Sequence, residues 1–265
     1  MARSALLNVM VQAAMKAGRS LARDFGEVQN LQVSLKGPGD YVSQADRKAE
    51  EIIFTELSRA RPGYAFLMEE RGAVDGDDAQ HRWIVDPLDG TTNFLHGIPI
   101  FAVSIALERQ GQLVAGVVYN PGMDELYTAE RGGGAFMNDR RLRVSARTKL
   151  SDSVIGTGVP HLGRGHHGNY LIELRNVMGE VSGIRRMGAA ALDLCYVAAG
   201  RMDGFWEEGL SAWDVAAGTL IIREAGGFVS DRDGANDMFG NGSIVAGNEA
   251  IHRALLKALK KPLRA

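Results

Sequence analysis

Apolar residues recur every three or four positions in several segments of the chain, which is the spacing of one face of a helix. Between Leu7 and Leu21 this spacing predicts an amphipathic helix over residues 4–25. A cap at Ser43 marks the start of a second helix, which Pro62 ends. Further helices are predicted at residues 168–178, 189–199 and 212–224 and around Ile251–Leu259.

Short apolar runs without helical spacing predict strands that are buried on both faces. They lie at residues 64–68, 83–85, 101–107, 113–119, 126–129, 142–144, 154–157, 204–206, 228–230 and 243–246. Strands dominate the middle of the chain, and strands and helices alternate from about Ser151. This mixture predicts an α/β fold of layered sheets and helices. No long polar linker interrupts residues 1–265, so we expect a single domain.

The composition narrows the class of protein. Hydrophobic residues make up 45% of the 265 positions and charged residues 23%, which indicates a globular chain. The net charge of −2 argues against a nucleic-acid-binding surface, and the single cysteine excludes an internal disulfide. No run reaches the roughly 18 apolar residues of a membrane span. We expect a cytoplasmic protein, because Asn8 and Gln12 interrupt the apolar N-terminal stretch that a signal peptide would need.

Acidic residues follow two of the predicted buried strands. Glu69 and Glu70 come after the first, and Asp86 and Asp89 come after the next, within Trp-Ile-Val-Asp-Pro-Leu-Asp-Gly-Thr-Thr-Asn at 83–93. Carboxylates of this kind are the ligands that hard cations such as Mg²⁺ prefer. The simpler alternative is that the two aspartates only stabilise a turn, but it leaves the strand-end glutamates without a role.

Backbone amides that could bind an anion accompany these carboxylates. Gly90 allows close approach of the backbone to a ligand, and Thr91 to Asn93 resemble the first turn of a short helix with free N–H groups. Carboxylates for a cation beside amides for a phosphate suit metal-assisted phosphoryl transfer to water. Asp214 begins a further apolar helix, where we expect it to be the N-cap and to contact the same metal.

Three blocks of the sequence resemble the inositol monophosphatase family of Mg²⁺-dependent, lithium-sensitive phosphatases. The Glu-Glu pair at 69–70 comes first, and residues 83–93 contain an Asp-Pro-Leu-Asp-Gly-Thr signature. Residues 213–227 begin with Trp-Asp and end in Glu-Ala-Gly-Gly. The blocks occur in the family's order, and the resemblance covers nearly the whole chain. It implies an αβαβα sandwich, a homodimer and a phosphomonoester hydrolase.

The resemblance also implies a set of metal ligands. Glu69, Asp86 and the carbonyl of Leu88 would hold a first Mg²⁺. Asp86, Asp89 and Asp214 would hold a second, and Glu69 would also reach a weaker third ion. A water activated by bound metal could then attack the phosphate in line, without a protein nucleophile.

Other matching residues are implied to orient water and substrate. Thr91, held by Asp46, would orient the attacking water together with Glu69, and the amides of Gly90 and Thr91 would hold the phosphate. The substrate contacts implied in this way are Gly90, Thr91, Thr92, Gly188, Ala189, Ala190 and Glu207.

The resemblance favours inositol monophosphate or a similar small polyol phosphate as the substrate. Asp-Gly-Thr-Thr at 89–92 is typical of the polyol-phosphate branch. Ala189, however, stands where relatives that hydrolyse inositol phosphates often carry Thr or Ser. The same chemistry on histidinol phosphate, a sugar bisphosphate or a nucleotide 3′,5′-bisphosphate therefore stays open. So do a mainly protein-binding regulatory role and a metal-free glycosidase, although a glycosidase would leave Glu69 and Asp214 without a function.

Overall fold

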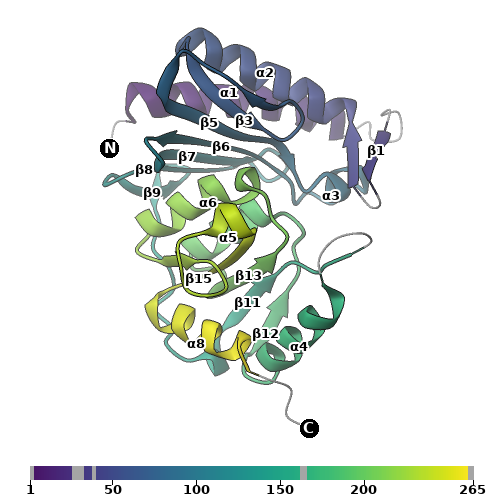
Figure 1. Cartoon of the computed structure of the whole chain (residues 1–265), viewed down its shortest axis with the longest axis vertical. Helices are drawn as coiled ribbons and strands as arrows, with labels where there is room; N and C mark the ends of the chain where they lie inside the picture. The colour runs from purple at the N-terminus through teal and green to yellow at the C-terminus, as the bar shows by residue number, and fades with distance from the viewer. Residues whose placement is uncertain (1–2, 26–32, 38–39, 162–165, 262–265) are drawn as a thin grey trace.

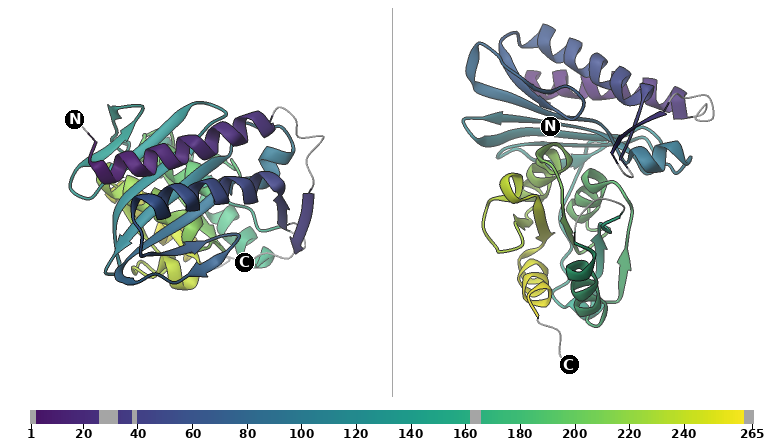
Figure 2. Two further views of the ribbon diagram at one scale, coloured as in Figure 1. Left: turned by 90° about the horizontal axis from the view of Figure 1, so that it is seen from above. Right: turned by 45° about the vertical axis from the view of Figure 1, so that its right-hand side comes forward.

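The structure, a computed structural model, describes residues 3–25, 33–37, 40–161 and 166–261. Two main sheets alternate with layers of helices, so the order through the molecule is helix, sheet, helix, sheet, helix (Figure 1). In Figure 2 the two N-terminal helices lie side by side across the first sheet. This is the αβαβα arrangement that the resemblance implies.

The first helical layer and the first sheet come from the N-terminal half. The layer consists of α1 (Ala5–Phe25) and α2 (Gln44–Ala60), with a hairpin of β1 (Val33–Gly37) and β2 (Asp40–Ser43) between them in the chain. The eight-stranded sheet has the order β10-β9-β8-β7-β6-β5-β3-β4. Its strands are β3 (Tyr64–Met68), β4 (Gly72–Val74), β5 (Asp78–Asp89), β6 (Ala102–Arg109), β7 (Gln112–Asn120), β8 (Glu125–Glu130), β9 (Gly134–Met137) and β10 (Arg140–Arg141).

The C-terminal half builds the remaining layers. The helices between the sheets are α5 (Ala190–Ala198) and α6 (Ala212–Glu224). The second sheet has the order β12-β11-β13-β15-β14 and contains β11 (Val154–Thr157), β12 (Gly183–Arg185), β13 (Gly204–Glu208), β14 (Phe228–Ser230) and β15 (Ser243–Gly247). The last layer consists of α4 (His167–Met178) and α8 (Glu249–Leu259). The short helices are α3 (Thr91–Leu95), α7 (Met238–Asn241) and a 3₁₀ turn at Leu150–Asp152.

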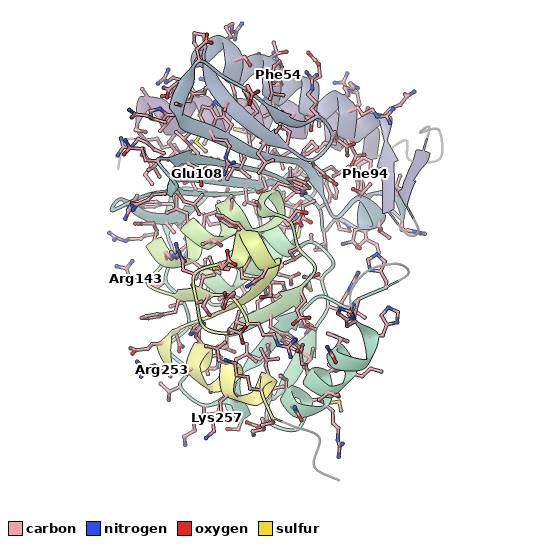
Figure 3. All side chains as sticks on the ribbon, in the orientation of Figure 1. Phe54, Phe94, Glu108, Arg143, Arg253 and Lys257 are labelled. Atoms are coloured by element: carbon pink, nitrogen blue, oxygen red, sulfur yellow. The ribbon has the colours of Figure 1, made fainter. Side chains whose placement is uncertain are left out.

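Apolar side chains fill the space between the layers (Figure 3). Successive residues of β5 alternate between the two faces of the first sheet: Trp83 and Val85 pack with α1 and α2, whereas Ile84 joins the core around α5 and α6. Because both faces are buried, the strand has a continuous apolar run instead of an alternating one. Among the described residues, no helix combines the length and the apolar character that crossing a bilayer requires.

Most of the elements predicted from hydrophobic spacing are confirmed. The helix predicted over residues 4–25 is α1, and the predictions for 212–224 and 154–157 match α6 and β11. The strand predicted at 142–144 is wrong. Pairing ends at Arg141, and Leu142 is apolar because its side chain is buried in the core between the sheets.

Candidate active site

Two acidic residues meet where the parallel strands β3 and β5 run side by side. The register pairs Met68 with Val85, so Glu69 and Asp86 follow next to each other. The backbone N–H of Glu69 donates to the carbonyl of Val85 at 3.2 Å. The strands therefore deliver these acids to one place, as the sequence predicts.

The segment after Asp86 leaves the regular ladder and turns into α3. The pairing of β5 with β6 jumps from Asp86 to Asp89, which leaves Pro87 and Leu88 outside the ladder and suits a residue without an N–H. Oδ1 of Asp86 accepts a hydrogen bond of 2.9 Å from the N–H of Leu88. Gly90 has a φ of 85°, a left-handed conformation that favours glycine, and caps α3.

The hydroxyl of Thr91 is held by its neighbours. It lies 3.1 Å from Oδ1 of Asp46 and 3.0 Å from the carbonyl oxygen of Leu88. Asp46 lies in the first turn of α2 and is fully buried. Because the hydroxyl proton is directed at these acceptors, the lone pairs of Oγ1 can accept from a donor in the adjoining cavity.

The N-terminal end of α5 packs against the same turn. Oδ2 of Asp89 accepts a hydrogen bond of 2.7 Å from the backbone N–H of Ala191. Nδ2 of Asn93 donates to the carbonyl of Met187 at 2.9 Å. These bonds fix the segment before α5 beside the acids of β5.

Asp214 reaches the site from α6. Ser211 is the N-cap of this helix, and its backbone N–H donates to Oδ2 of Asp214 at 2.7 Å in a capping box. The prediction that Asp214 is itself the N-cap is therefore wrong. It is the third residue of the helix, because the serine three positions earlier takes the cap.

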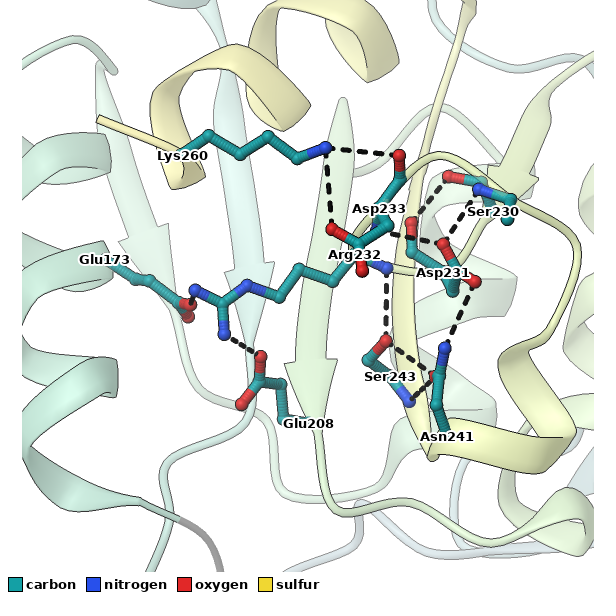
Figure 4. A network of polar contacts seen from close by, with 10 residues as sticks. Glu173, Glu208, Ser230, Asp231, Arg232, Asp233, Asn241, Ser243 and Lys260 are labelled. Carbon is teal, nitrogen blue, oxygen red and sulfur yellow. Dashed lines mark hydrogen bonds and ion pairs between the residues drawn. The ribbon is translucent and has the colours of Figure 1, made fainter. Parts of the chain in front are cut away.

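Strand β13 ends in two acids that face opposite ways, as successive residues of a strand do. Glu207 lies against Gly158, where a Cβ would be only 1.8 Å from the carboxyl carbon of Glu207. Glu208 forms an ion pair with Arg232, which also contacts Oε1 of Glu173 at 2.6 Å (Figure 4). The second sheet therefore presents Glu207 towards the first.

These groups line one cavity of about 120 Å³. It includes every residue that the sequence places in the site except Asp46, which lies behind Thr91. The lining residues are Glu69, Asp86, Leu88, Asp89, Gly90, Thr91, Thr92, Gly158, His161, Arg186, Gly188, Ala189, Ala190, Glu207, Leu210 and Asp214.

The sequence analysis did not place four of the lining residues in the site. They are Gly158, His161, Arg186 and Leu210. Gly158 and His161 follow β11, which pairs in parallel with β13 and so ends beside Glu207. The pairing of β11 with β13 is what places Gly158 and His161 in the site, and a single sequence gives no local signal for such a pairing.

Burial and mutual repulsion govern the charges in this cavity. Burial raises the pKa of Asp86 well above its usual range, and the negative charges of Glu69 and Asp89 raise it further. Burial and the charge of Asp214 raise the pKa of Asp89 in the same way. Ionising these groups costs free energy that a nearby cation would offset, so the site fits a divalent cation with oxygen ligands.

No preformed cage surrounds such an ion. Within the part of the chain that the structure describes, no three or more His, Cys, Asp or Glu side chains form a group that could hold a metal ion. Mg²⁺ does not require one, because it is usually held by one or two carboxylates, with water and substrate phosphate completing its shell. The oxygen donors of the cavity are therefore compatible with Mg²⁺.

Residues 2–263 match the family model described as the inositol monophosphatase family. This chain belongs to the inositol monophosphatase family. A Mesorhizobium japonicum protein named inositol-1-monophosphatase is 84% identical over the full length of both chains. The family predicted from the three sequence blocks is therefore confirmed.

Relatives in this inositol monophosphatase family carry a second kind of name as well. A Pseudomonas aeruginosa protein named Nus factor SuhB is 47% identical, with 97% of each chain covered. The crystal structure of the extragenic suppressor protein suhB from Bartonella henselae matches with a TM-score of 0.96. That chain is 72% identical, and the match covers 98% of this chain and 100% of the other.

One buried acid beside the site was missed by the sequence analysis. Glu50 of α2 is 1% exposed and accepts a hydrogen bond of 2.9 Å from the backbone N–H of Glu70. Burial raises its pKa, whereas the N–H groups of Glu70 and Arg71 lower it. Its signal in the sequence is an acid one helical turn after Asp46 on a helix that buries one face.

Proposed function

We propose that this protein is a Mg²⁺-dependent phosphomonoesterase that releases phosphate from inositol monophosphate or a similar small polyol phosphate. One observation carries the proposal: acids from four separate segments line a single cavity together with Gly90 and Thr91. Carboxylates suit a hard cation, and backbone amides suit a phosphate. Membership of a phosphatase family supports the same reaction class.

The metal ligands that we propose follow the family pattern. Glu69, Asp86 and the carbonyl of Leu88 would hold one Mg²⁺, and Glu69 would contribute to a third. Asp86, Asp89 and Asp214 would hold a second ion. These three carboxylates are not a preformed group, so they would come together around the second ion only as it binds. Bound there, the ions would lower the pKa of a coordinated water and offset negative charge on the phosphate. The raised pKa values of Asp86 and Asp89 support this assignment, because a cation removes the cost of their charge.

The chain's own groups would orient the reactants. Thr91, whose hydroxyl proton is directed at Asp46 and Leu88, would accept a hydrogen bond from the attacking water and orient it together with Glu69. The amides of Gly90 and Thr91 would donate to phosphate oxygens. Precise placement of this kind lowers the barrier by removing the entropy cost of bringing the reactants together.

The polyol would lie between the N-terminal end of α5 and β13. Glu207 can accept hydrogen bonds from two hydroxyl groups. Gly188, Ala189, Ala190 and Thr92 line the same cavity and would complete the substrate contacts. Ala189 is 1% exposed and offers no polar group. Histidinol phosphate, a sugar bisphosphate and a nucleotide 3′,5′-bisphosphate therefore remain alternative substrates.

Phosphate release from a panel of substrates tests the proposal. The panel contains inositol 1-phosphate, histidinol phosphate, fructose 1,6-bisphosphate and a nucleotide 3′,5′-bisphosphate, each with Mg²⁺ and with EDTA. We expect Mg²⁺-dependent release with a preference for inositol 1-phosphate. A Mg²⁺-dependent preference for another member of the panel would support the proposed reaction and contradict the proposed substrate. Phosphate release in EDTA would contradict the metal dependence. No release from any substrate would contradict the proposal that the protein is an enzyme.

A regulatory, protein-binding role is a second candidate, which the name Nus factor of the Pseudomonas aeruginosa relative favours. The two roles can be separated with a folded variant that lacks turnover, such as Asp89→Asn. If this variant still restores growth to a host that lacks its own relative of the protein, binding is the essential role. If only the active protein does so, hydrolysis is essential.

We also infer a single domain and a homodimer. A single domain is supported by the cavity itself, which draws residues from both sheets. A homodimer is supported by two large apolar side chains on α4, since Leu171 and Met178 are 62% and 61% exposed. Sedimentation should give twice the 28.6 kDa of one chain, and Leu171→Glu should shift it towards the monomer.

A further inference from the structure

Two buried acids lie one turn apart on α2, and each contacts a different arm of the active site. One arm is the segment after β3, which carries Glu69, and the other is the segment after β5, which carries Thr91. Asp46 is fully buried and Glu50 is 1% exposed, and their spacing of four residues places them on the same face of the helix. Asp46 lies 3.1 Å from the hydroxyl of Thr91, on the arm that follows β5. Glu50 contacts the other arm, which follows β3.

The hydrogen bonds and the ion pair of Glu50 join it to the two residues that follow Glu69. Its Oε2 accepts a hydrogen bond of 2.9 Å from the N–H of Glu70, and the N–H of Arg71 also donates to its carboxylate. Nε of Arg71 lies 3.3 Å from its Oε1. On the other side of the acid, the N–H of Glu69 itself donates to Val85 at 3.2 Å. The backbone is therefore held on both sides of Glu69.

A buried carboxylate at this place needs a reason. Removing a carboxylate from water is costly unless hydrogen bonds and an opposite charge compensate it, and an apolar residue would fill the same space on α2 without that cost. The neighbouring Glu51 forms an ion pair with the same Arg71, but its side chain is 60% exposed. Glu51 already pairs with the charge of Arg71, so this ion pair alone does not explain why residue 50 is a buried acid.

We propose that Glu50 is a positioning residue that fixes the backbone from which the Glu69 carboxylate projects, so that α2 sets the spacing between Glu69 and Thr91. The inference rests on the proposed metal site. The chain holds Thr91 through Asp46 and Glu69 through Glu50, and one rigid helical turn joins the two. Loss of Glu50 should loosen a metal ligand without touching the metal.

Binding of Mn²⁺ alone, measured by calorimetry or electron paramagnetic resonance without substrate, tests this inference. Residues that orient metal ligands typically account for about 10- to 100-fold in metal affinity. We expect Glu50→Ala to raise the Kd for Mn²⁺ at least about tenfold. Glu50→Gln retains an acceptor oxygen of the same reach and should recover part of the loss. Glu51→Gln is the matched control, because it removes a charge beside the same Arg71, and it should leave the Kd unchanged.

The outcomes separate this inference from the proposed function. If the unaltered protein binds no Mn²⁺ and releases no phosphate, the proposed metal site fails and the inference fails with it. If the unaltered protein binds Mn²⁺ and folded Glu50→Ala binds it equally well, only the inference is overturned. An equal loss in Glu51→Gln would also overturn it. If Glu50→Ala does not fold, the Kd for Mn²⁺ is compared between Glu50→Gln and Glu51→Gln. Weaker Mn²⁺ binding in Glu50→Gln supports the inference, and equal binding in the two variants overturns it.

Discussion

The carboxylate of Asp89 accepts a hydrogen bond of 2.7 Å from the backbone N–H of Ala191, a residue 102 positions later in the chain. This bond joins the end of β5 in the first sheet to the first turn of α5 between the sheets. In the proposed mechanism, one side chain would thus contact a metal ion and orient the helix that faces the polyol. Metal binding and substrate binding should consequently be coupled through Asp89.

Asp89→Asn should abolish turnover while the protein stays folded. Asparagine keeps the shape and an oxygen that can accept from Ala191, but it removes the charge that the metal needs. We expect kcat to fall at least about 100-fold and the free energy of unfolding to change by less than about 1 kcal/mol. Urea unfolding and phosphate release check both values. Normal turnover would contradict the two-metal assignment.

Thr91→Val should lower kcat with little change in KM. Valine has nearly the same shape but cannot accept a hydrogen bond from the attacking water, and misplacing a reactant by about 1 Å can cost about 10²-fold in rate. Without the hydroxyl, Asp46 also loses a hydrogen-bond partner in a buried place, which we expect to cost about 1–3 kcal/mol of stability. Thr91→Ser keeps the hydroxyl and should restore most of kcat. An equal loss of kcat in Thr91→Val and Thr91→Ser would argue against a role of the hydroxyl in orienting the water.

The contribution of His252 to stability should be lost in mild acid. Burial lowers the pKa of this histidine, the charge of Arg253 lowers it further, and the ring lies 2.8 Å from Oγ of Ser230. Since the unfolded chain binds a proton near 6.5 and the folded chain resists it, the stabilisation is present above that pH and lost below it. Urea unfolding of the unaltered protein and of His252→Gln at about pH 7.5 and about pH 5.5 checks this contribution. Acidification should be less favourable to the stability of the unaltered protein than to that of the variant, and an equal change in both would contradict the assignment to His252.

Local sequence patterns predict the elements and the acids of this site, because each depends on neighbouring residues. The apolar run before Glu69 and the proline and glycine around Asp89 each occupy one short stretch. The polyol contacts could not be derived in this way. Gly188 and Glu207 entered only through the resemblance to the family, since nothing in their own segments points to a sugar.

Contacts between distant segments leave no local signal. Gly158 meets Glu207 only because β11 pairs in parallel with β13, and a glycine in a short apolar run can equally mark a bulge. Leu142 shows the opposite error, in which an apolar residue suggested a strand although tertiary packing had buried it. The positions of such residues depend on how remote strands pair and helices pack, and a single sequence does not show that pairing or packing.

Removing Arg232 should destabilise the fold, because Glu173 is 3% exposed and would remain as a buried charge without this guanidinium (Figure 4). Only the glutamate of this pair is buried, since the Arg232 side chain is 34% exposed. Leaving a buried acceptor without its partner typically costs about 1–3 kcal/mol. We expect a loss of this size for Arg232→Met in urea unfolding, and a smaller loss when Glu173→Gln is added. The control is Arg253→Met, which breaks an exposed pair with Glu249 and should cost less than about 1 kcal/mol. Similar losses in Arg232→Met and Arg253→Met would contradict the argument.

Gly158→Ala should weaken binding of the polyol without unfolding the protein. The new methyl would meet the end of the Glu207 side chain at about 1.8–2.3 Å, and that flexible carboxylate can move where a backbone could not. Loss of its hydrogen bonds to hydroxyl groups should raise KM for inositol 1-phosphate about tenfold, with a smaller change in kcat. Gly168→Ala in α4 is the control, because its methyl would have no atom within 4 Å. Hydrolysis of p-nitrophenyl phosphate, which has no polyol, should be the same in both variants. An equal loss on that substrate in Gly158→Ala would place the damage at the phosphate and would argue against a polyol contact for Glu207.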